Sequence, residues 1–207
     1  MKYGDEDIGL QGNRILLARS ISRITPAPLI NLYAGIIVAF SSPIGLGPIL
    51  NPWTTLGICF VFMVVLPVTP IIYEANKGRI DLDVSKQSMR TKFFLFAIFC
   101  YTLAYIAYWI AQCDVMRLLS AAYFAVTLGI MIATLRSKVS VHSAGIGGPG
   151  TALIFVYGIL AAPVLFVWAA VVWARTELKQ HTLLQSTAGL VIAILITIAT
   201  YIILNAI

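Results

Sequence analysis

The sequence predicts an all-α protein, a polytopic bundle of about six to seven transmembrane helices. Of its 207 residues, 60% are apolar and only 11% are charged, and the mean hydropathy is +0.93. A soluble domain carries about 25% charged residues, so this composition excludes an ordinary water-soluble fold. Several apolar runs reach the roughly 20 residues that a helix needs to cross a bilayer. We therefore expect a membrane protein whose few polar residues carry its function.

Residues 1–27 are expected to form an interfacial segment, and residues 28–207 a single transmembrane domain. The first segment mixes acidic residues with scattered arginines, which leaves no apolar core for a signal peptide. Its apolar residues suit a short helix that lies in the membrane interface. These residues are Ile15, Leu16, Ile21 and Ile24.

The apolar runs place most of the spans. The expected spans cover residues 28–46, 53–73, 93–111, 118–135 and 183–207. A polar loop over residues 74–92 separates the second span from the third. Pro67 and Pro70 fall inside the second span, where neighbouring helices can satisfy the backbone groups that a proline frees.

The stretch 142–174 is compatible with one long crossing or with a hairpin of two short helices that turns near residues 158–163. With a hairpin, thirteen of the fourteen Lys and Arg residues lie on the side of the N-terminus: four in the N-terminal segment, five in the 74–92 loop, two at 136–138 and two at 175–179. A single crossing weakens this bias to eleven against three. The positive-inside rule therefore favours the hairpin, and it places the basic side in the cytoplasm.

The bulk composition also narrows the possible partners. The net charge of +6 does not indicate nucleic-acid binding, because the basic residues lie between apolar spans, as in loops near anionic lipid head groups. The three cysteines, Cys59, Cys100 and Cys113, show no C-x-x-C spacing, so neither a metal site nor a disulfide framework is expected.

Both histidines of the chain, His142 and His181, lie in polar segments beside spans, and the hairpin places them on the same side. Basic residues accompany them there in three groups. These residues are Arg136, Lys138, Arg175, Lys179, Lys86, Arg90 and Lys92. Arg and Lys match phosphoryl oxygens, and a histidine can attack phosphorus or protonate a leaving oxygen. The pattern therefore predicts a phosphate site.

The last of these groups has a specific spacing. His181 follows Arg175 by six residues, and Gln185 follows His181 by four, which puts His181 and Gln185 on one helix face. This run resembles the third motif, S-R-x5-H-x3-D, of the type 2 phosphatidic acid phosphatase superfamily.

Two further segments are similar to motifs of the same family. Lys138, Ser140 and His142 precede a glycine-rich stretch, as in the K-x-S-x-H form of the second motif in a divergent prokaryotic branch. The loop 78–92 is a weak likeness of the first motif, K-x6-R-P. The resemblance covers residues 74–207, and it implies a multi-pass protein of a prokaryotic cell membrane.

The resemblance also implies a chemistry, which is hydrolysis of a lipid phosphate or prenyl (di)phosphate without metal or cofactor. His181 would attack phosphorus and form a phosphohistidine. His142 would protonate the leaving oxygen and then activate water. The residues implied to bind the phosphoryl group are Arg175, Lys138, Ser140 and Arg90, with Lys86 or Lys92 replacing the lysine of the first motif.

The sequence departs from the family pattern at several positions. The Asp that orients the nucleophile is Gln185 here, whose amide oxygen can accept a hydrogen bond from His181 but carries no charge, so we expect slower turnover. Val139 and Val141 replace the Pro and Gly of the second motif. Seven residues before Arg90, where the first motif has Lys, this chain has Asp83.

Two other functions fit the same residues. A prenyl or lipid transferase would bind a diphosphate through Mg²⁺ held by aspartate pairs, and Asp81 with Asp83 offers one such pair but no second. A non-catalytic protein that binds lipid phosphates is the other alternative, which Gln185 favours. In each case the expected partners are membrane lipid and an amphiphilic phosphate.

Overall fold

The computed structural model describes residues 3–6 and 9–204, and every regular element in this part of the chain is helical. Residues 1–2, 7–8 and 205–207 of the expected N-terminal segment and last span lie outside the described residues. The α-helices are α1 (Asn13–Ile24), α2 (Ala27–Ser41), α3 (Pro52–Cys59), α4 (Leu66–Asn76), α5 (Arg90–Ile110), α6 (Asp114–Arg136), α7 (Val141–Tyr157), α8 (Val164–Glu177) and α9 (Leu183–Ile203).

The predicted all-α polytopic bundle is confirmed. Five helical stretches are long and apolar enough to cross a membrane, and α1 with α2, bent by 59° at their junction, is a sixth candidate. A π-helical segment, Phe60–Val65, joins α3 to α4 within one of the five stretches. The first and fourth spans differ from the expected bounds, since α2 ends at Ser41 and α6 begins at Asp114.

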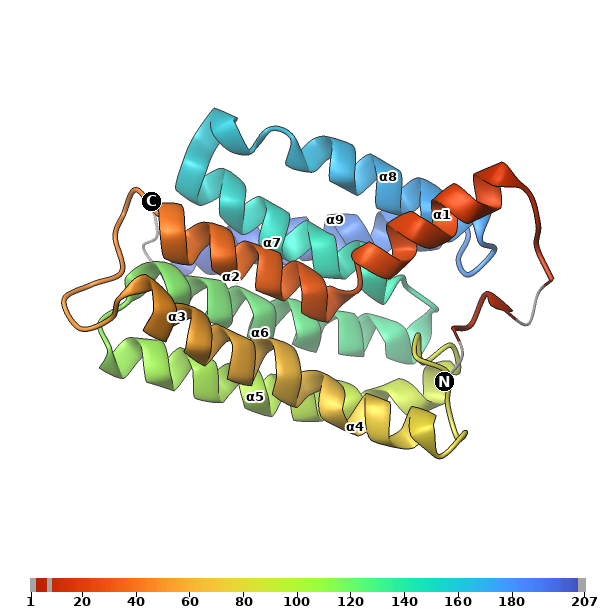
Figure 1. Cartoon of the computed structure of the whole chain (residues 1–207), viewed down its shortest axis with the longest axis horizontal. Coiled ribbons are helices and arrows are strands. Elements are labelled where there is room, and N and C mark those ends of the chain that lie inside the picture. Colours follow the sequence, from red (N-terminus) through yellow and green to blue (C-terminus); the bar gives the residue numbers. More distant parts are fainter. Residues whose placement is uncertain (1–2, 7–8, 205–207) are drawn as a thin grey trace.

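The stretch 142–174 is a hairpin, as the charge distribution predicted. α7 ends where Gly158 takes a positive φ of 58°, and a short 3-10 turn, Gly158–Ala161, leads through Pro163 into α8. α8 returns along α7 and also packs on α1 and α9 (Figure 1). The start of α7 and the end of α8 therefore lie at the same end of the bundle.

That end collects most of the charge of the protein. The loops 77–89, 137–140 and 178–182 lie together there with α1, at the right of Figure 1, and we call it the basic end. Among the described residues, Arg117 is the one Lys or Arg at the opposite end, where it pairs with Asp114 at 2.8 Å.

The N-terminal helix packs on the hairpin. Ile15 and Ala18 are buried against Ala174 and Leu178 at the end of α8. Leu16, in contrast, is 59% exposed on the other side of α1. α1 therefore covers α8 with one apolar face and leaves other apolar residues exposed, and the placement of this segment in the membrane interface stays a prediction.

The loop before α7 is held against α9 by a close backbone approach. The Ser140 N–H donates to the Gln185 carbonyl oxygen at 3.1 Å, and a Cβ on Gly189 would lie only 2.5 Å from the Ser140 carbonyl oxygen. Because Gly189 has no side chain, the 137–140 loop reaches the first turns of α9 and brings Lys138 near His181.

Replacing Gly189 with Ala tests this approach. We expect Gly189→Ala to lower the free energy of unfolding by about 1–3 kcal/mol, since the added methyl group collides with backbone that cannot rotate away. Thermal unfolding in detergent measures the change. Gly57→Ala is the matched control, because nothing lies within 4 Å of its added Cβ and the same change within a helix stabilises by about 0.5–1 kcal/mol. Equal effects of the two variants would contradict the close approach.

Candidate functional site

The turn between α8 and α9 explains the spacing of Arg175 and His181. Lys179 adopts a left-handed conformation with φ 52°, which reverses the chain after α8. The N–H groups of Gln180 and His181 then both donate to the carbonyl oxygen of Arg175, at 3.2 and 3.3 Å. His181 is thereby folded back onto the end of α8 beside Arg175.

Gln185 takes part in the cap of α9. Its side-chain oxygen accepts the N–H of Thr182 at 3.1 Å, and the Thr182 hydroxyl accepts the Gln185 N–H at 3.2 Å, which is a capping box. The predicted role of Gln185 in orienting His181 therefore competes with a backbone hydrogen bond. The Nδ1 atom of His181 is buried, and among the described residues it has no hydrogen-bond partner.

Ser140 has a clear structural role that the sequence did not indicate. It is the N-cap of α7, and its hydroxyl oxygen accepts the N–H of Ser143 at 3.2 Å and the Ser143 hydroxyl at 3.1 Å. The side chain is fully buried, so the geometry does not direct it to a phosphoryl group as expected. His142 follows two residues later, in the first turn of α7, and 13% of its side chain is exposed.

Arg90 joins two of the loops at the basic end. Its Nε donates to the Val84 carbonyl oxygen at 2.9 Å, and its Nη1 donates to that of Val139 at 3.2 Å. The residue is 4% exposed. This fixed guanidinium lies at the first turn of α5, with its charge close to His181 and Lys138.

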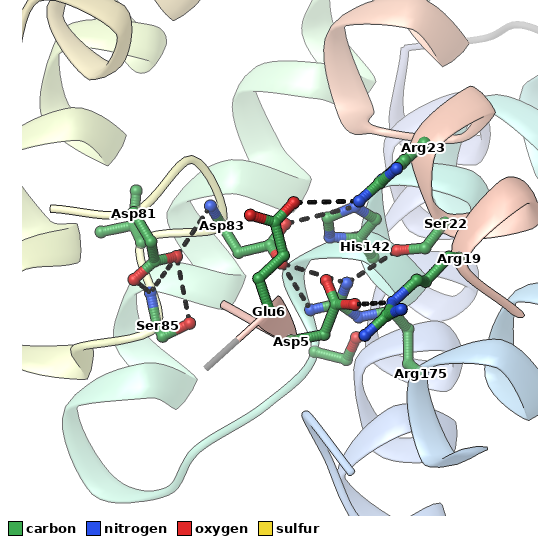
Figure 2. Close-up of polar contacts among 12 residues, drawn as sticks. Asp5, Glu6, Arg19, Ser22, Arg23, Asp81, Asp83, Ser85, His142 and Arg175 are labelled. Carbon is green, nitrogen blue, oxygen red and sulfur yellow. Dashed lines mark hydrogen bonds and ion pairs between the residues drawn. The ribbon is translucent and has the colours of Figure 1, made fainter. Parts of the chain in front are cut away.

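The centre of the site is an ion pair that sequence reasoning missed. The Asp83 carboxylate lies 3.4 Å from Nη1 of Arg175 and 3.9 Å from Nε2 of His142 (Figure 2). The side chains of Asp83 and Arg175 are 5% and 3% exposed. A carboxylate thus lies between Arg175, which was expected to bind the phosphoryl group, and His142, which was expected to protonate the leaving oxygen. One feature of the sequence could have indicated this ion pair: Asp83 lies seven positions before Arg90, where the first motif of the phosphatase family has Lys.

The N-terminal segment covers this centre from outside. Ser22 of α1 accepts a hydrogen bond from Arg175 Nη1 at 2.8 Å. Asp5 pairs with Arg19 at 2.6 Å (Figure 2). Gly4 lies so close to Ser85 and Gln180 that a Cβ would collide with the Ser85 hydroxyl. Residues 3–6 therefore close the basic end over the Asp83 loop, which the sequence did not predict.

The clustered cations shift the pKa values of their neighbours. Burial and the charges of Arg175, Arg90 and Lys138 lower the pKa of His181 to about 3, against a smaller opposite effect of Gln185. Burial and the charges of Arg90 and Arg175 also lower the pKa of Lys138. His181 is therefore neutral at physiological pH, as a nucleophile must be.

Two predicted phosphate ligands lie outside the cluster. Lys92 pairs with Glu74 at 3.7 Å, with half of its side chain exposed. Lys86 is exposed on the 77–89 loop. Neither residue lines the cavities beside the histidines.

Each histidine lines its own cavity. His142 lines a largely apolar cavity of about 440 Å³ within the bundle, together with Asp83 and Arg90. His181 and Lys138 line a more open cavity of about 370 Å³ at the basic end. Arg175 donates to the Asp83 carboxylate on one side, and its backbone accepts from His181 on the other. An anion that replaced Asp83 would contact Arg175 and His142.

Comparison of the chain with models of known protein families, with curated proteins and with solved structures finds no match.

The low pKa of His181 predicts a pH dependence of stability. Its folded-state pKa of about 3 lies below the ordinary value near 6.5. The unfolded chain therefore binds a proton that the folded chain does not, and stability falls as the pH drops below about 6.5, by about 1.4 kcal/mol per pH unit from this group. Unfolding of the wild type and of His181→Gln in detergent between pH 7.5 and 4.5 measures it. The slope should be smaller in the variant, and equal slopes would contradict the assignment.

Asp83→Asn tests whether the carboxylate occupies an anion site. Without it, Arg175 lacks its counter-charge, so we expect a lower melting temperature and a binding of inorganic phosphate that is about 10-fold tighter, or roughly 1.4 kcal/mol. The phosphate-induced rise of the melting temperature reports the affinity. Asp114→Asn, at the opposite end of the bundle, is the control. Weaker phosphate binding in Asp83→Asn would refute this interpretation.

Proposed function

We propose that the protein is a membrane phosphatase that resembles the type 2 phosphatidic acid phosphatase superfamily and hydrolyses a lipid phosphate or prenyl (di)phosphate. The observation that carries the proposal is the convergence of the predicted residues at one end of a transmembrane bundle. Two histidines and three cations from separate elements lie at that end, with His142 on the apolar cavity and His181 on the more open one. These residues are His142, His181, Arg90, Lys138 and Arg175.

The chemistry would proceed in two displacements. In the first, a nitrogen of neutral His181 attacks phosphorus, the phosphorus–oxygen bond to the lipid breaks, and the leaving oxygen takes a proton from His142. In the second, His142 accepts a proton from water while the water oxygen attacks phosphorus and breaks the phosphorus–nitrogen bond. Inorganic phosphate and both histidines are regenerated. Fixed guanidinium groups stabilise the charge that develops on the phosphoryl oxygens.

Asp83 has to give way in this scheme. A phosphoryl group carries up to two negative charges and three acceptor oxygens, so it satisfies Arg175 better than one carboxylate does. Binding would therefore exchange one anion for another and leave the buried arginine paired throughout. This exchange is the physical reason to expect modest affinity for free phosphate.

Two alternatives remain as outcomes of the test. A protein that binds lipid phosphate without hydrolysis is favoured by the pairing of Asp83 with Arg175 and by the uncharged Gln185. A magnesium-dependent transferase is less supported, because the Asp81 carboxylate accepts four hydrogen bonds from Asp83 and Ser85 within its own loop. Asp83 meanwhile faces Arg175, so the two carboxylates do not converge on one ion.

The proposed setting is a prokaryotic cell membrane, with the basic end in the cytoplasm. The support is the concentration of described Lys and Arg residues at that end, which the positive-inside rule assigns to the cytoplasm.

Phosphate release in excess EDTA from lipid phosphates and prenyl diphosphates tests the function. We expect release by the wild type, and a loss of about 10²–10⁴-fold in kcat for both His181→Ala and His142→Ala. Lys92→Ala is the control, because it removes a cation of the same end without touching the cluster, and it should keep its activity. Release only with Mg²⁺ would favour the transferase. Binding without release would favour the non-catalytic protein.

A further inference from the structure

The large cavity has one polar mouth and apolar walls. Asp83, Arg90 and His142 line the end of the cavity that lies at the basic end, which we call its mouth. From there it extends between α2, α4, α5, α6 and α7, along residues that are mostly aliphatic or aromatic. Representative wall residues are Val68, Ile71, Phe93, Phe94, Val126 and Ile130. A charged mouth above an apolar interior is the pattern of a site for an amphiphile.

The depth of the cavity follows from the helices that line it. Along α5 the lining runs from Arg90 to Tyr101, which is about 16 Å at 1.5 Å per residue. Along α6 it runs over a similar length, from Ile130 back to Leu119. A volume of about 440 Å³ over this depth has room for an extended hydrocarbon chain. A farnesyl chain has a length of this order.

The far end of the cavity is polar again. Asn31 and Tyr123 line it and are 1% and 7% exposed. The Asn31 side-chain oxygen and the Tyr123 hydroxyl have no hydrogen-bond partner among the described residues. The Asn31 amide nitrogen donates to the Met63 carbonyl oxygen at 2.6 Å, which fixes the side chain in place. A hydrocarbon chain at this depth would meet polar groups whose hydrogen bonds it cannot satisfy, so the chain should end before it reaches them.

We propose that this cavity binds the single hydrocarbon chain of the phosphate-bearing substrate and limits its length to about that of a farnesyl group. This inference rests on the proposed function and narrows its substrate class to single-chain lipid monophosphates of bounded length. The phosphate lies at the mouth, against Arg90 and Arg175, and the chain lies inside the bundle, not in the surrounding bilayer. Asn31 and Tyr123 mark the length limit.

The test compares chain lengths in the full-length protein. Purified protein in detergent is given geranyl, farnesyl and geranylgeranyl monophosphate, and binding is followed by thermal stabilisation beside phosphate release. The wild type should bind farnesyl phosphate more tightly than geranyl phosphate. It should bind geranylgeranyl phosphate no more tightly than farnesyl phosphate. In Ala122→Leu, which fills the deep part of the cavity, farnesyl affinity should fall about 10-fold while geranyl affinity is kept.

Ala121→Leu is the matched control, because the neighbouring residue on α6 makes the same change in volume and does not line the cavity. Ala97→Leu fills the cavity from α5 and replaces Ala122→Leu if that variant does not fold. A chain-length profile that these variants leave unchanged, or equal losses for all three chains, would overturn the inference. Chain-length-dependent binding without phosphate release would refute the proposed hydrolysis alone and leave the inference standing.

Discussion

The arrangement of the basic end depends on the buried guanidinium group of Arg175. An arginine cannot lose its charge in a protein, and at 3% exposure it needs an anionic partner. Asp83 supplies this charge from a loop 92 residues earlier, and Ser22 adds a hydrogen bond from α1. Removing one partner of such a pair costs about 3–5 kcal/mol because the other charge stays buried. One side chain thus holds the hairpin, the 77–89 loop and the N-terminal helix together.

Much of this fold could be predicted because a membrane restricts the choices. The apolar runs predicted most spans, because every backbone polar group in the bilayer must be paired within a helix. Counting the charges on each side then resolved the 142–174 hairpin. The six-residue spacing of Arg175 and His181 indicated the cluster, because the turn between α8 and α9 brings these two residues together. Asp83 was missed for a physical reason. The pattern places loops at one end, but tertiary packing alone decides which side chain is buried there. The same limit misplaced Lys92 and hid the capping role of Ser140.

The cations of the basic end and the apolar cavity lie in one bundle, and each provides for a different part of the proposed ligand. Cations at the end of transmembrane helices lie at the depth of lipid head groups, and the apolar cavity continues from that depth into the bundle. A soluble phosphate ester would gain nothing from the cavity, and a neutral lipid would gain nothing from the cations. Under the proposed function, a molecule that carries both a phosphate and a hydrocarbon chain gains binding energy from the cations and from the cavity, so specificity requires both parts of the ligand.

Under the proposed function, the Asp83 carboxylate links the stability of the free protein to substrate binding. Without any anion, the positive charges of Arg175, Arg90 and Lys138 would repel one another in a poorly solvated site, and the lowered pKa of Lys138 records this repulsion together with burial. Asp83 relieves the repulsion while the site is empty. A phosphoryl group can take its place only by offering more charge and more acceptor oxygens to the same donors. The contact that stabilises the free protein therefore sets the minimum interaction that a ligand must supply, which favours ligands whose chain adds the burial energy of the cavity to the charge of the head group.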